Sequence, residues 1–150
     1  MDSDDPYIVQ KAEDQWQTNC VLRYNRFQSC KKKLSKRLVH LLENCHFFHD
    51  TYIQEISLKK IIGRKQDTFD LILTMQYDGY EEPLNGRLIH REVQQLNSNM
   101  PNLMNNASFG SYLYGEIFIN DQKMWVHNFI LFEECELNIV CKKIEWEDVS

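Results

Sequence analysis

The sequence predicts an α+β fold: an N-terminal amphipathic helix, or a pair of helices, packed on a mostly antiparallel sheet of about six strands or a partly open barrel. Apolar residues recur at helical spacing as far as Cys45, and from about Asp50 they recur at the two-residue spacing of strands. No helical run long enough for a parallel crossover separates the strand-like runs. We therefore expect a single domain over residues 1–150, with a helical region over 1–45 and a β region over 46–150.

The helical prediction is strongest in the second half of the helical region. Apolar side chains there recur at intervals of three, four and seven and form one stripe, which consists of Leu34, Leu38, Leu41, Leu42 and Cys45. No Gly or Pro occurs between Ile8 and Cys45. The basic residues of this stretch fall mostly off the stripe, so the sequence predicts a basic outer face and an apolar inner one.

The strand predictions depend on alternation, which is clearest in residues 67–79. One predicted face is apolar and consists of Phe69, Leu71, Leu73, Met75 and Tyr77. The other predicted face is wet and consists of Thr68, Asp70, Thr74, Gln76 and Asp78, with Ile72 as the exception. A strand over residues 51–62 precedes this one and ends at Gly63, and a strand over residues 85–96 follows it.

The remaining strands follow a loop predicted over residues 97–110, which is rich in Asn and Ser and has no period. Residues 111–132 read as a hairpin around Asn120-Asp121. Residues 134–147 read as the last strand. Its apolar face changes from odd positions up to Cys141 to even positions from Ile144, which predicts a bulge near Lys142 and Lys143.

Composition excludes several classes of protein. No apolar run in the 150 residues is long enough to span a membrane, and the first ten residues carry acids but no basic residue, unlike a secretory signal. We therefore expect a cytoplasmic protein. Five cysteines with no CxxC pair argue against a disulfide framework and against a metal site. Cys135 and Cys141 share one face of the last strand, as small buried hydrophobes do.

Charge is unevenly distributed along the chain. Between Gln15 and Leu42 there are seven basic residues and no acid, although the whole chain carries a formal net charge of −5. Such segregation marks either surfaces for different partners or two halves that neutralise each other in the fold. The basic helix face, with Arg23, Arg26 and Lys31 to Lys36, could bind RNA. The acidic character of the whole chain disfavours a nucleic-acid partner.

A cluster of His46, His49 and Asp50 stands where the helical pattern changes to the strand pattern. Imidazole and carboxylate groups are metal ligands, and His90 and His127 could join them from other strands. The spacing matches no ligand motif. We favour a structural interpretation, in which His49 and Asp50 form hydrogen bonds to backbone groups at the junction between helix and sheet.

Two acidic turns are candidate partner-binding surfaces. The first contains Asp78, Tyr80, Glu81 and Glu82, and the second contains Glu133 and Glu134. Tyrosines among carboxylates suit a basic protein partner, because aromatic groups provide affinity and charge provides a fast association rate. The alternative is that acids and glycine are simply the residues that hairpin turns favour.

The usual catalytic motifs are missing from the sequence, which has no GxSxG, P-loop, GxGxxG or HExxH motif. With only five glycines, it also has no glycine-rich loop that could hold a phosphate. We therefore expect a protein that is not an enzyme and that has no cofactor.

Three stretches carry a resemblance to a known group: FFHDTYIQEISL with DLILTMQYDG, then YLYGEIFI, and then LNIVCKKIEW. They resemble uncharacterised bacterial domain-of-unknown-function proteins, in which a helical N-terminal part leads through a His-Asp stretch into a β domain. Some small β proteins of this kind look like immunity proteins that neutralise a toxin by covering its active site. The resemblance implies a binding protein and assigns no binding residues.

These observations lead to a first function hypothesis and two alternatives. We expect a non-enzymatic, cytoplasmic bacterial protein that binds another protein, such as a basic toxin, and does not associate with membranes. The alternatives are a metal-dependent enzyme or sensor that uses His46, His49 and Asp50, and an RNA-binding protein that uses the basic helix face. The oligomeric state is left open.

Overall fold

The computed structural model describes residues 21–79, 81, 83–99, 111–131 and 135–149. Residues 21–30 are helical and lead into the 3-10 turn η1 (Lys31–Lys33), the helix α2 (Lys36–Asn44) and the 3-10 turn η2 (His46–Phe48). Within the described residues the strands are β1 (Tyr52–Ile61), β2 (Thr68–Tyr77), β3 (Leu84–Ser98), β4 (Tyr112–Ile119), β5 (Trp125–Leu131) and β6 (Cys135–Asp148).

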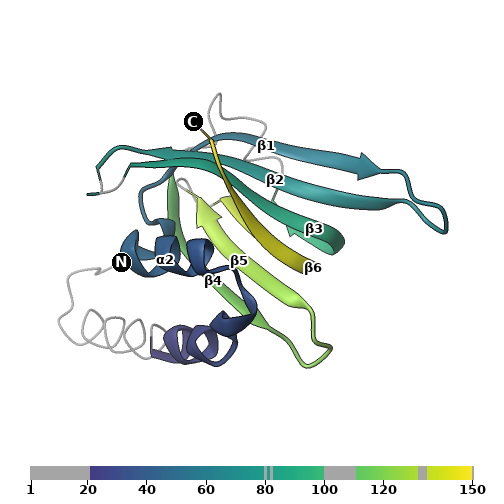
Figure 1. Cartoon of the computed structure of the whole chain (residues 1–150), viewed down its shortest axis with the longest axis horizontal. Coiled ribbons are helices and arrows are strands. Elements are labelled where there is room, and N and C mark those ends of the chain that lie inside the picture. The colour runs from purple at the N-terminus through teal and green to yellow at the C-terminus, as the bar shows by residue number, and fades with distance from the viewer. Residues whose placement is uncertain (1–20, 80, 82, 100–110, 132–134, 150) are drawn as a thin grey trace, which may run out of the picture.

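The strands form one antiparallel sheet in the order β1-β2-β3-β6-β5-β4, with the helices beside it (Figure 1). This arrangement confirms the predicted α+β class, and the sheet is not closed into a barrel. β1 and β4 are the two edge strands, yet they meet where they begin, because Tyr52, the first residue of β1, pairs with Ser111, which directly precedes β4. The sheet is therefore bent so that its opposite edges touch at one place, which we call the corner.

The predicted apolar stripe of the helical region is buried. Leu34, Leu38, Leu41, Leu42 and Cys45 belong to the same hydrophobic core as the inward side chains of the sheet. The helical region is broken into two helices at Ser35, whose hydroxyl accepts a hydrogen bond from the Leu38 N–H at 3.1 Å and caps α2. Arg37 then ties α2 to the end of the sheet through two 2.9 Å hydrogen bonds to the Asp148 carboxylate.

The described cysteines are packing residues of this core. Cys30, Cys45, Cys135 and Cys141 are buried, whereas Cys20 lies outside the described residues. Burial raises the pKa of Cys141 to about 12, so this thiol stays protonated and unreactive at neutral pH. Among the described residues, no helix combines the length and the apolar character that a membrane crossing requires.

The change of apolar face in β6 is confirmed. Cys141 and Ile144 are both buried, and the two lysines between them are both exposed. The extra residue that shifts the register lies on the partner strand β3, between Val93 and Gln95, and not on β6 as predicted. Glu92 has φ 50°, which shows where β3 bends.

Asp70 is a correction to the predicted wet face of β2, because its side chain is only 3% exposed. Its carboxylate accepts hydrogen bonds from the Glu92 N–H at 3.0 Å and from Arg91 Nη1 at 2.8 Å. A bulge frees backbone donors from the strand ladder, and Asp70 satisfies the one at Glu92. The Asp70 carboxylate therefore has a structural role, which is to stabilise the bend of β3.

The far end of the β1–β2 hairpin is a second difference from the prediction. Phe69 and Leu58 lie on the apolar face, in register with buried neighbours, yet they are 41% and 56% exposed. Figure 1 shows the reason: this hairpin extends away from α2, so none of the helices that the structure describes covers its tip. Two-residue alternation identifies the face of a strand but not how far the covering layer reaches.

We predict that Asp70→Asn lowers the free energy of unfolding by about 1–3 kcal/mol, because one of the two accepting oxygens becomes an NH2 group, which cannot accept a hydrogen bond from Arg91 or from the Glu92 N–H. The matched control is Asp67→Asn in the same hairpin, whose pair with Lys60 is solvent-exposed. The control should change the free energy of unfolding by less than about 1 kcal/mol. Urea denaturation of both variants measures this difference, and equal losses would contradict a structural role for Asp70.

Candidate functional site

The corner is held by backbone hydrogen bonds between the start of β4 and the residues that enter β1. Asp50 N–H donates to the Tyr112 carbonyl at 2.7 Å, and Tyr112 N–H donates to the Thr51 carbonyl at 2.8 Å. The chain reaches this corner through three residues with left-handed backbone, Phe47, Phe48 and Asp50, which turn it sharply from α2 into the sheet.

His49 has a structural partner at the corner. The β4–β5 register shifts between Tyr112 and Tyr114, so Leu113 is an extra residue in β4. His49 Nδ1 donates a hydrogen bond to the Leu113 carbonyl, and the imidazole ring stacks on Tyr114 with ring centres 5.5 Å apart. His49 thus supplies a donor to a carbonyl at an irregular position of the strand ladder.

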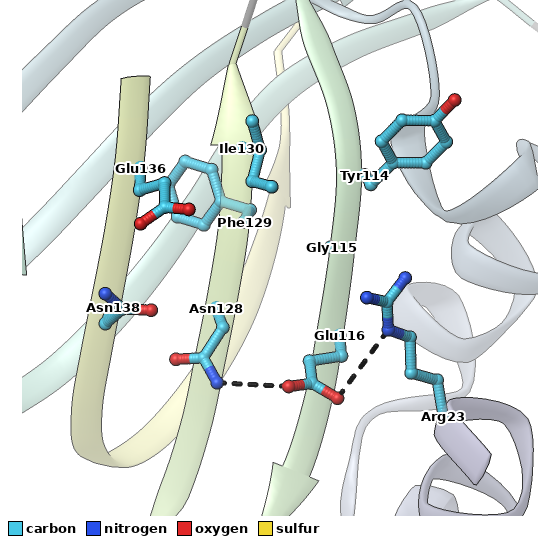
Figure 2. Close-up of a pocket in the computed structure, with 9 residues that line it drawn as sticks. All are labelled: Arg23, Tyr114, Gly115, Glu116, Asn128, Phe129, Ile130, Glu136 and Asn138. Carbon is cyan, nitrogen blue, oxygen red and sulfur yellow. Dashed lines mark hydrogen bonds and ion pairs between the residues drawn. The ribbon is translucent and has the colours of Figure 1, made fainter. Parts of the chain in front are cut away.

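A groove of about 220 Å³ lies on the outer face of the sheet over β4, β5 and β6, with the helix of residues 21–30 beside it (Figure 2). Polar residues from three adjacent strands line it in one row. Glu116 of β4 is paired with Asn128 of β5, and Asn128 is paired with Asn138 of β6. Its other lining residues are Arg23, Tyr114, Gly115, Phe129, Ile130 and Glu136.

The carboxylate of Glu116 is held and neutralised within the groove. Asn128 Nδ2 donates to its Oε1 at 3.1 Å, Arg26 Nη1 donates to its Oε2 at 3.4 Å, and Arg23 Nε lies 4.0 Å from Oε2. Arg26 also lies over the ring of Phe118, at 4.8 Å from its centre. Glu116 is therefore an organising residue, and the exposed Glu136 carries the remaining negative charge of the groove.

Behind the groove, a buried hydrogen-bonded chain runs through the core from Tyr112. Its hydroxyl lies 3.1 Å from His127 Nε2, His127 Nδ1 lies 2.7 Å from His90 Nε2, and His90 Nδ1 lies 3.0 Å from the Leu71 carbonyl. All three side chains are fully buried. Each of their polar atoms in this chain has a partner, which removes the cost of burying them.

The direction of every hydrogen bond in this chain follows from the Leu71 carbonyl. A carbonyl only accepts, so His90 Nδ1 carries a proton and its neutral Nε2 accepts. His127 Nδ1 must then donate to His90, and His127 Nε2 accepts from the Tyr112 hydroxyl. Burial lowers the pKa of His90 to about 4 and lowers the pKa of His127 well below its ordinary value, while it raises the pKa of Tyr112.

The sequence-predicted acidic residues are only partly described. Asp78 and Glu81 are exposed beyond the end of β2, whereas Tyr80, Glu82, Glu133 and Glu134 lie outside the described residues. The strands that lead into the two acidic turns end close together. Gln76 near the end of β2 pairs with Tyr52 at the corner, and Leu131 at the end of β5 pairs with Tyr112.

The metal-site alternative gains no support in the described part of the chain. No three His, Cys, Asp or Glu side chains there converge as metal ligands would. His90 and His127 bond to each other inside the core, and His49 Nε2 lies 3.5 Å from Asp50. The side chain of His46 is outside the described part.

Much of the basic helix face is used within the fold. Arg23 and Arg26 face Glu116, Lys31 lies 3.0 Å from Glu43, and Arg37 binds Asp148. This matches the second interpretation of the charge segregation, in which the basic segment neutralises acids elsewhere in the chain. It leaves fewer free cations for a nucleic-acid backbone than the sequence suggests.

The groove was not found from the sequence, although one signal was present. The structure centres the β4–β5 hairpin on Gln122 and so sets Glu116 opposite Asn128, whereas a two-residue turn at Asn120-Asp121 would set Glu116 opposite Trp125. Glu116 and Asn128 both interrupt otherwise apolar strands. Asn138 and Arg23 gave no such signal, since they come from a separate strand and a helix.

Comparison with known proteins leaves the groove to be interpreted from its geometry. No protein family model, no curated protein and no solved structure matches the chain. The described lining contains amide, carboxylate, guanidinium and phenol groups, and it contains no serine, cysteine or histidine that could act as a nucleophile or base. The groups of this lining can donate and accept hydrogen bonds with a ligand.

We predict that the protein loses stability as the pH falls from about 6.5 towards about 4. Both buried histidines have a lowered pKa in the folded state, so the unfolded chain takes up protons at a higher pH than the folded chain does. This proton uptake lowers the free energy of the unfolded chain and therefore the free energy of unfolding. The slope contributed by each histidine is at most about 1.4 kcal/mol per pH unit. Urea denaturation across this pH range measures it.

The control for this pH dependence is a comparison of variants. His90→Gln should flatten the slope, and Leu88→Val, which shortens a buried side chain and removes no titratable group, should lower the stability but leave the slope unchanged. An unchanged slope in His90→Gln would show that the buried imidazoles do not titrate as proposed.

We also predict that Gly115→Ala destabilises the fold by about 1–3 kcal/mol, because a Cβ there would lie 1.6 Å from the Tyr112 hydroxyl oxygen. Tyr112→Phe costs a buried hydrogen bond but removes the closest clashing atom. The double variant should therefore lose less stability than the sum of the two single losses. Strictly additive losses in thermal denaturation would argue against this contact.

Proposed function

We propose that the protein is a non-enzymatic module that binds another protein through its groove and the adjacent corner. One observation carries the proposal: a preformed row of polar side chains, Glu116, Asn128 and Asn138, runs across three strands on the outer face. The exposed acids of the corner, Asp50 and Asp78, continue this surface.

The amide groups of the groove suit a peptide main chain. An asparagine side chain offers two donors and one acceptor group, so Asn128 and Asn138 can pair with both the N–H and the C=O of a bound segment. Asn128 already uses one donor on Glu116, which fixes the orientation of its amide. A binding group that is held in place before binding loses less entropy when the ligand arrives.

The size and charge of the groove suit one or two side chains of a partner. Its volume of about 220 Å³ is below the roughly 300–1,000 Å³ that is usual for sites that enclose small molecules or cofactors. Glu136 is exposed in it and favours a lysine or arginine of the partner. Tyr114 is 45% exposed at the rim, next to His49, and offers an aromatic surface.

We infer a partner with a basic surface, and the location of the acidic turns supports this. The described ends of β2 and β5, from which these turns start, both lie at the corner beside the groove. Opposite charge would raise the association rate and would set the orientation of the complex. Together with the resemblance to bacterial immunity-like proteins, this favours a cytoplasmic protein that neutralises a basic toxin by covering it.

The test begins with affinity capture from the native lysate, with and without nuclease, followed by titration calorimetry with the captured protein. We expect Glu136→Lys and Asn138→Ala to weaken binding at least about tenfold, because each removes a central contact. The double variant Asp78→Lys/Glu81→Lys should chiefly slow association and reduce its salt dependence.

The matched control is Asp121→Lys, an exposed acid in the β4–β5 turn, at the end of these strands away from the corner. It should bind as the wild type does. Wild-type affinity in both groove variants, or equal weakening by Asp121→Lys, would contradict the proposed surface. Loss of every partner on nuclease treatment would favour the basic helix face instead.

A further inference from the structure

The edge strand β1 has a free side over most of its length. Among the described residues, only β2 pairs with Ile53–Ile61, and contact with the other edge of the sheet is limited to the bridge between Tyr52 and Ser111. β1 belongs to the hairpin that extends away from the helices (Figure 1). An unpaired strand edge presents a row of backbone donors and acceptors to any strand that can align with it.

We propose that β1 pairs with β1 of a second copy of this chain, antiparallel, around a two-fold axis at Ser57. Such an interface is self-complementary, because each contact occurs twice. The two sheets then continue into each other across the axis. This interface lies on the opposite edge of the sheet from the strand β4 that borders the groove, so it leaves the groove itself free, while its end, where Tyr52 faces Ile62 of the second copy, reaches the corner.

Charge complementarity sets the register of this pairing. With Ser57 opposite Ser57 of the second copy, Glu55 faces Lys59 of that copy, and this pair forms twice. Both side chains are exposed, and neither makes an ion pair with a described residue of its own chain. Opposite charges directly across a strand pair stabilise it, and like charges destabilise it.

Neighbouring registers lack this match. A strand pair that keeps the faces of both sheets aligned can shift only by whole pairs of side chains. Moving the axis to Leu58 sets Ile56 opposite Lys60, and moving it to Lys59 sets two lysines opposite each other. Moving it to Ile56 sets Glu55 opposite Ser57. The axis at Ser57 alone among these places Glu opposite Lys and an apolar residue opposite an apolar residue.

The same register covers exposed apolar surface. Ile56 lies opposite Leu58 of the second copy, on the face that β2 continues with Leu71 and Leu73. Leu58 is 56% exposed in the single chain although it belongs to this apolar face. The pairing therefore buries a side chain that the helices of its own chain do not reach.

The lysines of β1 have to be weighed against this proposal, because edge lysines commonly prevent strand pairing. Lys60 has a partner within its own chain, since its Nζ lies 3.3 Å from Asp67. Lys59 makes no ion pair with a described residue of its own chain, and the proposed register supplies Glu55 of the second copy. The lysines of β1 thus disfavour pairing with other strands in general, but they are compatible with the symmetric β1–β1 pairing around Ser57.

Sedimentation equilibrium of the purified chain, from about 1 to about 500 µM, tests the proposal by mass action. We expect a concentration-dependent dimer for the wild type and for Asp121→Lys, an exposed charge reversal in the β4–β5 turn, away from β1. Glu55→Lys and Lys59→Glu should each weaken the dimer at least about tenfold. The double variant Glu55→Lys/Lys59→Glu should restore it, because the pairs re-form with exchanged signs.

A wild type that stays monomeric over this range overturns the proposal, and so does a double variant that is as monomeric as the single variants. A cross-link provides an independent readout. Directly opposed residues of antiparallel strands have Cα atoms about 4.5–5.5 Å apart, within reach of a disulfide.

Ser57→Cys should therefore form a disulfide-linked dimer under mild oxidation, while Gln66→Cys, at the exposed hairpin tip, should not. The described native cysteines are buried and do not compete. Equal cross-linking at both positions, or none at Ser57→Cys, contradicts the register.

Discussion

Tyr112 is the residue on which this arrangement depends. Its backbone joins the start of β4 to the residues that enter β1, so it holds together the two edges of the bent sheet. Its hydroxyl begins the buried chain through His127 and His90, which ends at a carbonyl of β2. One side chain thereby connects strands from both ends of the sheet, and any displacement of it would leave buried polar atoms without partners.

The groove on the opposite face follows from the same constraint. Tyr112 points into the core, and the extra residue Leu113 lets Tyr114 point outward at the rim, where His49 packs against it. The register beyond this bulge brings Glu116 opposite Asn128. Because the inner face is fixed by packing and by buried hydrogen bonds, the outer row of polar side chains is held in place without a ligand. That rigidity favours recognition by a preformed surface.

The fold could be predicted from the sequence where a pattern is local. The stripe from Leu34 to Cys45, the hairpin of β4 and β5 and the face change before Ile144 all depend on side-chain spacing within one element, and the structure confirms them. Asp70 was placed wrongly, because its burial depends on a bend of β3 about twenty residues away. The alternation of polar and apolar residues predicts which face of a strand is buried. A bulge in the neighbouring strand can leave a backbone N–H without a partner, and a side chain of the first strand must then accept its hydrogen bond.

The groove and the pairing of the buried histidines could not be predicted from the sequence, for a related reason. His90 and His127 were considered as metal ligands because residue type alone suggests this chemistry. Only the order of strands in the sheet shows that they face each other within a sealed core. Arg23 comes to Glu116 from a helix far away in sequence. Sites assembled from separate elements require the topology first, and here the strand order differs from the order along the chain.

Long-range ¹H–¹⁵N NMR of the histidine side chains tests most directly the claim that this buried chain organises the molecule. The structure predicts that His90 and His127 are both neutral at pH 6, each with its proton on Nδ1, and that neither titrates near 6.5. A proton on Nε2 of His90, or an ordinary titration of either ring, would contradict it. Either result would mean that the hydrogen-bonded chain from Tyr112 to the Leu71 carbonyl does not hold the corner.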